Sequence, residues 1–416
     1  MPENWKTYKL TDLGTIARGK SKHRPRDASH LYGGKFPFIQ TGDVKAANHR
    51  LNKHTQTYSV AGLAQSKLWP ENTMCITIAA NIAETAILSY PACFPDSIIG
   101  FVADEDKCDI EFVEYLMQFF KKQIQTHSIG SVQDNINLGT FQRVEFTVPP
   151  LEEQKSIASI LSALDDKIEL NLRMNKTLEE MAMALYKHWF VDFGPFQEGE
   201  FVDSELGEIP KEWEVKSINA FGQVVCGKTP SKKDPDNFTH IGGYPFIKIP
   251  EMHGNVFLTE TLEKISEKGN QTQAKKLLPS GCINVSCIAT VGLVTINAFP
   301  SHTNQQINSI IPEKTNYRYY LYSTMISLKE RFLNEASGGS ATLNMNTSTF
   351  SKIEILKPDE ETLQQFSEMT TSIFSKILQN QEENQTLTQL RDTLLPKLIS
   401  GEVRVKDAEK TLSEVL

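Results

Sequence analysis

The chain is an internal duplication, because its second half repeats its first at a register of 208 to 209 residues. The register is 208 at the start of each copy, and one inserted residue then moves it to 209. A period this long exceeds any solenoid repeat, so each copy should be a globular domain with a trailing element, and the two should be related by an approximate two-fold. Matched positions include Trp5/Trp213, Gly19/Gly227, Lys20/Lys228, Pro37/Pro245, Pro70/Pro279, Asn137/Asn346, Asn171/Asn380, Asn175/Asn384 and Leu185/Leu394.

The composition allows several ordinary hydrophobic cores, since 416 residues include 39% hydrophobic and 23% charged side chains. The longest apolar stretch, at residues 75–88, is broken by Glu84, and the chain does not open on a basic segment followed by an apolar one. We therefore expect no membrane span, no signal peptide and a cytoplasmic protein. The closest two of the six cysteines, Cys282 and Cys287, match no zinc spacing, so we expect buried free thiols.

Basic residues gather at the start of the chain although the formal net charge is −8. Residues 1–70 hold twelve Lys and Arg against four Asp and Glu, and the acidic excess falls in the predicted helices and the tail. The net negative charge therefore does not exclude a basic face that could meet a nucleic acid. Five of the basic residues fall within nine positions: Arg18, Lys20, Lys22, Arg24 and Arg26.

Two segments, residues 151–192 and 358–400, have the spacing of coiled-coil helices, with seam positions at alternating steps of four and three. Each follows a proline, Pro150 or Pro358, and we expect Pro396 with Gly401 to close the second helix. The seam positions are Ile157, Leu161, Leu164, Ile168, Asn171, Asn175, Leu178, Ala182, Leu185 and Trp189, then Phe366, Thr370, Ile373, Ile377, Asn380, Asn384, Leu387, Arg391 and Leu394.

Both seams carry two asparagines at equivalent positions: Asn171 and Asn175 in the first, Asn380 and Asn384 in the second. A seam asparagine lowers stability but favours the register in which the amides can pair. We therefore expect the two helices to lie antiparallel and to be locked together by these four residues. Chance polar substitution is the alternative.

Residues 1–150 and 213–357 are predicted to be two similar globular domains. Short apolar runs with β-branched residues alternate there with Gly, Pro, Asn and Ser clusters, and strands are predicted at 74–78, 144–148, 283–288 and 353–356. Residues 193–212 are predicted to be a connector and 401–416 a C-terminal tail. The fold class is therefore α+β: two mixed α/β domains separated by two long antiparallel coiled-coil helices, with an internal pseudo-two-fold repeat.

Both copies match the phosphate-loop pattern GxxxxGK[ST], at residues 14–21 and 222–229. Such a loop binds nucleotide at the start of a helix, and neither Pro230 nor the broken run after Ser21 allows one. We interpret both matches as basic loops that contact DNA phosphates through the same donors. The basic residues of the second loop are Lys228, Lys232 and Lys233.

A second pattern imitates the acidic pair and lysine of a metal-dependent nuclease, at Asp96, Glu105 and Lys107. The second copy lacks it, so a solvated charged turn is the favoured interpretation. The nine histidines show no ligand spacing, and no catalytic triad or methyltransferase motif is present. The sequence therefore predicts no catalytic residues and no metal site.

Repeated polar loops precede the last strand of each copy, at residues 128–137 and 337–346. Their neutral side chains can read base edges, although such residues also cap turns. The segments that follow Pro-Phe-Ile in each copy have the same two interpretations. The candidate residues are Ser131, Gln133, Asn135, Ser340, Thr342 and Asn344 in the loops, and Gln40, Thr41 and Lys248 after Pro-Phe-Ile.

Three segments carry a family resemblance: Val148-Pro-Pro-Leu-Glu-Glu-Gln154, Leu206-Gly-Glu-Ile-Pro-Lys-Glu-Trp213, and the helix end at residues 387–403. With these, almost the whole chain resembles the specificity subunits of type I restriction-modification systems. One departure is Lys357-Pro-Asp-Glu-Glu, where the family usually repeats the Pro-Pro and Glu-Gln entry to the helix. The departure affects only the local start of that helix.

The resemblance implies that each globular domain is a target-recognition domain for one half of a split, asymmetric DNA sequence, and that the helices set the gap. A helix of about 40 residues is about 60 Å long, enough to bridge half-sites about 34–36 Å apart. The resemblance also implies partners: two modification subunits carrying S-adenosylmethionine and the adenine-methylating site, and restriction subunits using ATP and Mg²⁺. The chain itself would be non-catalytic and hold no cofactor. The alternatives are a stand-alone magnesium-dependent nuclease and a two-domain adaptor that binds protein.

Overall fold

The computed structural model describes residues 4–79, 82–129, 138–336 and 343–413, in two compact units. Unit 1 comprises Met1–Glu169 with Gln385–Leu416, and unit 2 comprises Leu170–Asn384. Two long helices pass through this division, since α6 (Leu151–Phe190) begins in unit 1 and α12 (Glu360–Ser400) begins in unit 2. Each unit therefore contains one half of each long helix.

A five-stranded sheet with the strand order β2-β8-β6-β7-β4 forms the centre of unit 1. Its neighbours pair antiparallel, except that β4 is parallel to β7. Successive residues of β6 face opposite sides, so Met74 packs toward α6 and α4 (Ile110–Ile129) while Cys75 packs against Trp69 and Phe94. The strands are β1 (Lys6–Lys9), β2 (Gly14–Arg18), β3 (Tyr32–Phe38), β4 (Arg50–Leu51), β5 (Gln56–Tyr58), β6 (Met74–Thr77), β7 (Thr85–Leu88), β8 (Ile98–Ala103) and β9 (Glu145–Val148).

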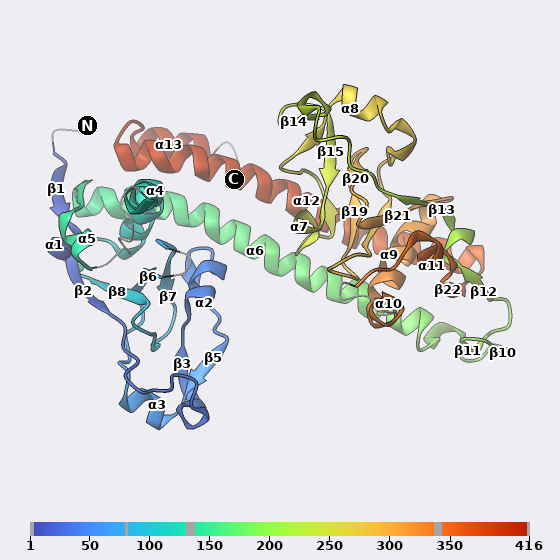
Figure 1. Ribbon diagram of the computed structural model, residues 1–416, viewed down its shortest axis with the longest axis horizontal. Coiled ribbons are helices and arrows are strands. Elements are labelled where there is room, and N and C mark those ends of the chain that lie inside the picture. The colour runs from blue at the N-terminus through green and yellow to red at the C-terminus, as the bar shows by residue number, and fades with distance from the viewer. Residues whose placement is uncertain (1–3, 80–81, 130–137, 337–342, 414–416) are drawn as a thin grey trace. The chain divides into compact units, whose positions relative to one another are not determined.

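The helices of unit 1 lie on one side of this sheet, and the larger of the unit's hydrophobic cores lies between them and the sheet. In Figure 1, α13 and the end of α12 lie alongside the first half of α6, while α3, β3 and β5 form the part of unit 1 farthest from α6. The helical elements are α1 (Leu10–Leu13), η1 (Ser29–Leu31), α2 (Thr41–Ala46), α3 (Val60–Ala64), α4 (Ile110–Ile129), α5 (Leu138–Arg143) and α13 (Val405–Ser413).

Unit 2 repeats the same sheet, in the order β13-β21-β18-β19-β16. Each strand lies 207 to 209 residues after its counterpart, and the final pair, β16 with β19, is again parallel. The duplication in the sequence is thus confirmed as a duplicated sheet. The strands are β10 (Phe201–Ser204), β11 (Gly207–Pro210), β12 (Glu214–Ser217), β13 (Gly222–Cys226), β14 (Phe238–Thr239), β15 (Tyr244–Ile247), β16 (Phe257–Leu258), β17 (Lys264–Ile265), β18 (Ile283–Ser286), β19 (Val294–Asn297), β20 (His302–Thr303), β21 (Ile307–Pro312) and β22 (Glu354–Lys357).

The copies differ in the smaller sheet beside the main one. Unit 1 has only the pair β3-β5 among its described residues, whereas unit 2 has a four-stranded sheet in the order β14-β17-β15-β20. The helical elements of unit 2 are η2 (Gly194–Phe196), η3 (Ile218–Ala220), η4 (Pro235–Asn237), α7 (Ile249–Met252), α8 (Glu267–Gln271), η5 (Ala274–Lys276), η6 (Thr315–Tyr317), α9 (Arg318–Ser327), α10 (Lys329–Ala336) and α11 (Thr347–Lys352).

Within unit 2, the two long helices run antiparallel and meet through the seam asparagines. Asn171 Nδ2 donates to Asn384 Oδ1 at 2.9 Å, and Asn380 Nδ2 donates to Asn175 Oδ1 at 2.8 Å. Asn171 and Asn380 are buried, so the bonded amide pairs specify this register against a shift along the seam. Farther along the same two helices, the core of unit 2 includes Ala182, Tyr186, Phe190, Phe366, Phe374 and Ile377.

Within unit 1, the other halves of the same helices meet through an apolar seam. Leu161 and Leu164 of α6 share a core with Leu387, Leu394 and Leu398 of α12. Both helix starts are anchored alike: Trp5 Nε1 donates to Glu153 at 3.3 Å, and in unit 2 Trp213 Nε1 donates to Asp359 at 3.2 Å.

Three details of the sequence-based description need correction. The second long helix ends at residue 400 as predicted, but Pro396 does not help to close it, because α12 continues through the proline to Ser400, where burial of Leu398 and Ile399 outweighs the missing hydrogen bond. Gly401, with a φ of +73°, ends the helix. The predicted tail contains the helix α13, and the predicted connector contains the β10–β11 hairpin.

All six cysteines are free, and five of them are buried. Burial raises the pKa of Cys282 to about 12 and that of Cys287 to about 11, so these thiols stay protonated. In the described part of the chain, none of the helices has the length and hydropathy needed to cross a bilayer.

Candidate nucleic-acid interface

One end of each five-stranded sheet gathers most of the described residues that the sequence marks as DNA contacts. In unit 1 this end is where Arg18 of β2 pairs with Ile99 of β8, next to the end of β6 at Thr77. Two segments meet there: the basic loop, residues 19–28, and the return loop, residues 89–97, which leads into β8. In unit 2 the basic loop is residues 227–234 and the return loop is residues 298–306.

Through their backbones, the glycine that opens each basic loop bonds to the first residue of the strand after the return loop, and the lysine bonds to the return loop itself. In unit 1, Gly19 N–H donates to Ile98 O at 2.8 Å, and Lys20 N–H donates to Phe94 O at 3.0 Å. The equivalent bonds in unit 2, from residues 227 and 228 to residues 307 and 303, measure 3.1 and 2.9 Å. The two loops are thus held together in the same way in both units.

This contact also explains why glycine stands at the first of the two positions. A Cβ atom on Gly19 would lie 2.3 Å from Pro95 O, and one on Gly227 would lie 2.2 Å from Asn304 O. Both distances are far inside van der Waals contact with backbone atoms, so any side chain would force the loops apart. The second glycine of the repeated GxxxxGK pattern is therefore explained by packing of the two loops.

The helix that a nucleotide-binding loop requires does not follow either pattern, as the sequence predicted. Residues 19–28 are irregular and are followed by the single turn η1, and β13 is followed by irregular chain up to η4. The backbone amides of Gly19, Lys20, Gly227 and Lys228 are engaged within the chain, so they do not offer donors to phosphate, and contact there would fall to side chains.

The basic side chains of unit 1 differ in their exposure and in their hydrogen bonds. Arg18 and Lys22 are exposed, and Lys20 is half-buried. Arg24 folds back on its own loop, donating to Ser21 O and to His23 O at 2.8 Å each. Arg26 reaches the return loop instead, where its Nη2 lies 2.9 Å from Asp96 Oδ2, with 47% and 42% of the two side chains exposed.

In unit 2, Lys228, Lys232 and Lys233 are exposed in the basic loop. Lys248 is half-buried at the start of α7, where its Nζ lies 3.2 Å from Glu263 and 5.7 Å from the centre of the Phe246 ring. The structure therefore gathers the first three in one loop and pairs the fourth with a carboxylate.

The candidate polar readers are only partly described. Gln40 and Thr41 lie at the start of α2, and Gln40 Nε2 donates to Gln56 Oε1 at 2.6 Å. Asn344 is exposed and forms a bridge with Ile288, just beyond the end of β18. The remaining candidates lie outside the described residues: Ser131, Gln133, Asn135, Ser340 and Thr342.

A polar cluster that the sequence analysis did not single out lies in the return loop of unit 2. Gln305 is exposed, and its Oε1 accepts a hydrogen bond of 2.7 Å from Thr229 Oγ1 of the basic loop. Beside it, Asn304 Nδ2 donates to Gln306 Oε1 at 3.0 Å. The available signal was the run Asn304-Gln305-Gln306, three neutral amides immediately before a buried strand.

The nuclease-like residues do not come together. Asp96 pairs with Arg26, while Lys107 pairs at 2.7 Å with Asp104 in an exposed turn. Among the described residues, no three His, Cys, Asp or Glu side chains are grouped so as to hold a metal ion. The geometry agrees with a charged turn.

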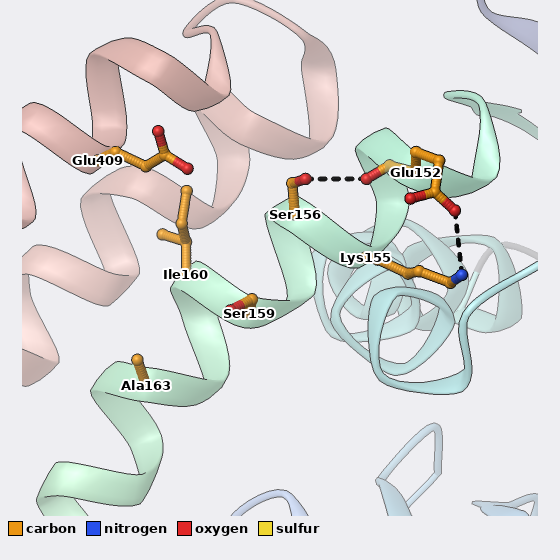
Figure 2. A pocket seen from close by; sticks show the side chains of 7 residues that line it. All are labelled: Glu152, Lys155, Ser156, Ser159, Ile160, Ala163 and Glu409. Carbon is orange, nitrogen blue, oxygen red and sulfur yellow. Dashed lines mark hydrogen bonds and ion pairs between the residues drawn. The ribbon is translucent and has the colours of Figure 1, made fainter.

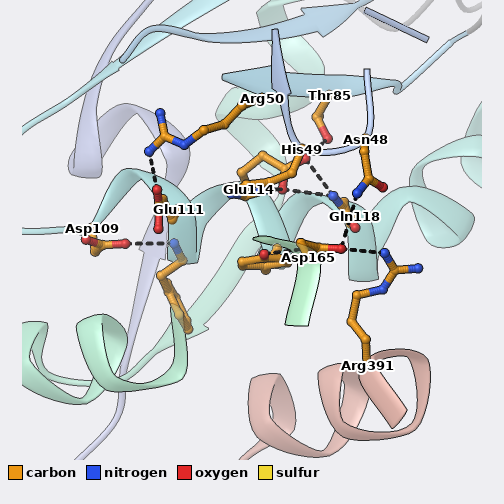
Figure 3. Close-up of polar contacts among 12 residues, drawn as sticks. Asn48, His49, Arg50, Thr85, Asp109, Glu111, Glu114, Gln118, Asp165 and Arg391 are labelled. Atoms are coloured by element: carbon orange, nitrogen blue, oxygen red, sulfur yellow. Dashed lines mark hydrogen bonds and ion pairs between the residues drawn. The ribbon is translucent and has the colours of Figure 1, made fainter. Parts of the chain in front are cut away.

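Unit 1 also contains a buried polar network that reaches the long helices (Figure 3). Asp165 of α6, only 5% exposed, accepts hydrogen bonds from Tyr115 of α4 at 2.7 Å and from Arg391 of α12 at 2.6 Å. A neighbouring branch joins Glu114 to His49 at 2.7 Å and to Thr85 at 2.6 Å. The network ties both long helices to α4 of the globular domain.

The pKa of His49 reflects this neighbourhood. Burial alone would lower it, but the hydrogen bond and the negative charge of Glu114, with Asp165 and Glu111 nearby, raise the pKa above its usual value.

A shallow hollow of about 410 Å³ lies on unit 1 between α6 and α13 (Figure 2). It is lined by small side chains of α6, including Ser159 and Ala163, and by Glu409 of α13. Glu152 pairs with Lys155 at its rim at 3.0 Å. The hollow lies on the long helix and contains none of the predicted DNA contacts.

The comparisons with known proteins agree with one another. The type I restriction modification DNA specificity domain matches the chain twice, at residues 2–180 and 210–389. The specificity subunit of the type I restriction enzyme HindI from Haemophilus influenzae is 38% identical, covering 96% of this chain and all of that protein. The MjaIX specificity subunit from Methanocaldococcus jannaschii is 27% identical over 98% of this chain and 95% of its own.

Among solved structures, the S subunit of a type I restriction-modification system from M. genitalium has the same fold. Its TM-score is 0.60 at 14% identity, and the match covers 95% of this chain and 96% of that one.

Proposed function

The chain belongs to the family of type I restriction-modification specificity subunits, and on that basis we propose that each unit reads one half of a split, asymmetric DNA sequence. The observation that carries the proposal is the duplicated five-stranded sheet, whose two copies present a basic loop at the same end. Because the side chains on the two loops differ, the two half-sites should differ in sequence.

Affinity and specificity should come from different residues. Exposed lysines and arginines of the basic loops, such as Lys22, Lys232 and Lys233, would contact phosphates and make binding depend strongly on salt. Neutral amides, such as Gln40 at the start of α2 and Asn344 beside the end of β18, would contact base edges in the major groove.

The long helices would fix the distance between the two half-sites. A helix of 40 residues, the length of α6, extends over about 60 Å. The bonded asparagine pairs in unit 2 support this role, because they oppose sliding of one helix along the other.

The catalytic chemistry would belong to partner proteins. We propose that two modification subunits, which would bring S-adenosylmethionine and the adenine-methylating site, dock on the long helices. The hollow between α6 and α13 is one surface available to them (Figure 2). Restriction subunits with ATP and Mg²⁺ would complete the assembly, and this chain would hold no cofactor.

Six free cysteines suit the reducing cytoplasm, which we propose as the compartment of this protein.

Mapping methylated adenines tests the proposal. The chain is expressed with its modification partner in cells that lack other adenine methylation, and the genomic DNA is sequenced for modified bases. We expect one split motif with a constant gap, absent when this chain is omitted. Methylation without a split motif, or methylation that persists without the chain, would contradict the proposal.

Neither alternative function has support among the described residues. A nuclease would need Asp96 and Lys107 at one site, and they pair with different partners. A protein adaptor would not account for the two basic loops at equivalent sheet ends.

A further inference from the structure

A turn in the return loop is built alike in the two units but carries different side chains. The turn at residues 95–98 is closed by a backbone hydrogen bond of 3.0 Å, and the turn at residues 304–307 by one of 3.2 Å. Asp96 and Gln305 hold the same place in these turns, 209 residues apart. The duplicated backbone has therefore kept its shape while this side chain has changed.

Each of these side chains is held by a residue of the basic loop. Arg26 Nη2 bonds Asp96 Oδ2 at 2.9 Å, and Thr229 Oγ1 donates to Gln305 Oε1 at 2.7 Å. About half of the Arg26 side chain is exposed and Gln305 is exposed as well. Surface pairs of this kind contribute little to stability, so stability does not account for the arrangement.

The chemistry of the two exposed groups differs in a way that matches two bases. A guanidinium held at one nitrogen by a carboxylate keeps the rest of its planar donor fork, which fits the O6 and N7 acceptors of guanine. A glutamine amide presents one donor and one acceptor side by side, which fits N7 and the N6 amino group of adenine.

We propose that the two pairs of side chains that join the basic loop to this turn, Arg26 with Asp96 and Thr229 with Gln305, form equivalent base-reading positions. Arg26, positioned by Asp96, reads a guanine in the half-site of unit 1, and Gln305, positioned by Thr229, reads an adenine in the half-site of unit 2. The inference rests on the proposed function and refines it. It also replaces the phosphate contact that the sequence suggested for Arg26 with a base contact.

The test uses the full-length chain in complex with its modification subunits, supplied with S-adenosylmethionine and a pool of duplexes randomised one position at a time within the mapped motif. Arg26→Lys keeps the positive charge and removes the fork. We expect preference for guanine at one position of one half-site to fall roughly 10- to 100-fold, with the other half-site unchanged. Lys22→Ala, the matched control in the same loop, should weaken binding on all sequences and reduce the salt slope by about 1.

The second arm tests unit 2. Gln305→Ala should remove preference for adenine at one position of the other half-site. Thr229→Val, which cannot donate to Gln305, should reduce that preference at the same position, and Thr229→Ser, which keeps the hydroxyl, should restore it.

The outcomes separate the inference from the proposed function. If Arg26→Ala weakens binding equally on every sequence and leaves the guanine preference unchanged, Arg26 is a phosphate contact and the inference is overturned while the function stands. If Gln305→Ala leaves the motif unchanged, the proposal that Gln305 reads an adenine is overturned. If the unaltered complex methylates no split motif, the proposed function itself fails.

Discussion

His302 is fully buried in unit 2, where its Nε2 lies 3.0 Å from Asn270 Oδ1 and its Nδ1 lies 3.3 Å from Gln273 Nε2. No carboxylate among the described residues bonds the ring, and burial lowers the pKa of His302 to about 4. Between pH 6.5 and about 4 the unfolded chain binds a proton here and the folded unit does not. We therefore expect the free energy of unfolding of unit 2 to fall as the pH falls over this range, by up to about 3 kcal/mol.

Denaturant titrations of the wild type and of His302→Gln across pH 4 to 7 check this expectation. The variant should lose most of the pH dependence that the wild type shows between these limits. His253→Gln, at an exposed histidine of the same unit, should behave as the wild type. Equal pH slopes for wild type and His302→Gln would show that this ring does not control the acid sensitivity.

Individual residues could be predicted where a spacing in the sequence repeats. They could not be predicted where their role depends on tertiary contacts between distant segments. The seam asparagines could be found because their spacing repeats in both helices. Gly19 and Gly227 were noticed as a motif, but the reason for them, a close approach of the return-loop backbone, appears only in three dimensions. Asp165 and His49 gave no signal, because their partners come from distant segments.

At the scale of elements, the Asp165–Arg391 pair joins the two long helices inside unit 1. The side chains are 6% and 18% exposed, so removing one charge leaves the other poorly compensated. We expect Arg391→Met to lower the free energy of unfolding of unit 1 by about 3 kcal/mol. Asp165→Asn in the same chain should recover a large part, because it removes the orphaned charge and keeps an acceptor for Tyr115.

Lys155→Met provides the control, because the exposed Lys155–Glu152 pair on the same helix should contribute less than about 1 kcal/mol. Denaturant unfolding of the three variants measures the difference. If Arg391→Met and Lys155→Met have equal effects, the buried pair does not hold the helices together. In unit 2 the equivalent positions are Phe374 and Ala182, so the same junction is apolar there.

A second prediction concerns the length of the helix pair. Repeating residues 172–175 in α6 and residues 381–384 in α12 adds one more asparagine layer and about 6 Å to the pair. We expect the gap in the methylated motif to grow by about two base pairs, since successive base pairs lie about 3.4 Å apart.

Sequencing of methylated adenines measures the gap in the lengthened variant. As a control, the repeat in α6 alone should abolish methylation, because it breaks the register of the asparagines. A lengthened chain that methylates the original motif with its original gap would rule out the helices as the ruler.

Elements with a strong periodic pattern were predicted well. The seam and Pro150 placed α6 within two residues of its ends, and the β-branched runs at 74–78 and 283–288 correspond to β6 and β18. Helix α13 was missed because only Ala408 among its described side chains is buried, which leaves a nearly polar sequence. The β14-β17-β15-β20 sheet was missed because its strands are two to four residues long, too short for alternation to show.

At the scale of the whole molecule, the duplication makes the two reading domains separable. We expect replacement of residues 1–150 by the same region of another family member to change one half of the methylated motif and leave the other half and the gap unchanged. Replacement of residues 213–357 should change the other half. Methylome sequencing of both chimaeras decides the matter, and a change in both halves after one exchange would contradict independent reading.

The whole-molecule plan was the most predictable level, since the register between the two copies holds along almost the whole chain and chance does not produce such a match. What the sequence did not reveal is how the long helices are shared. Leu387, Leu394 and Leu398 belong to the core of unit 1 although they lie more than 200 residues beyond Leu161 and Leu164, against which they pack. Periodicity shows that a helix has an apolar face but not which surface that face meets.

Because unit 1 includes the last residues of the chain, unit 2 can fold before unit 1 during synthesis. Unit 2 is one continuous stretch of chain and can close as soon as it leaves the ribosome, whereas unit 1 waits for its last segment, residues 385–416, to emerge. Until then the nascent polypeptide exposes the apolar side chains of Leu161 and Leu164. Exposed apolar side chains promote aggregation and are bound by chaperones. A chain truncated near residue 385 would contain every residue of unit 2 but only part of unit 1.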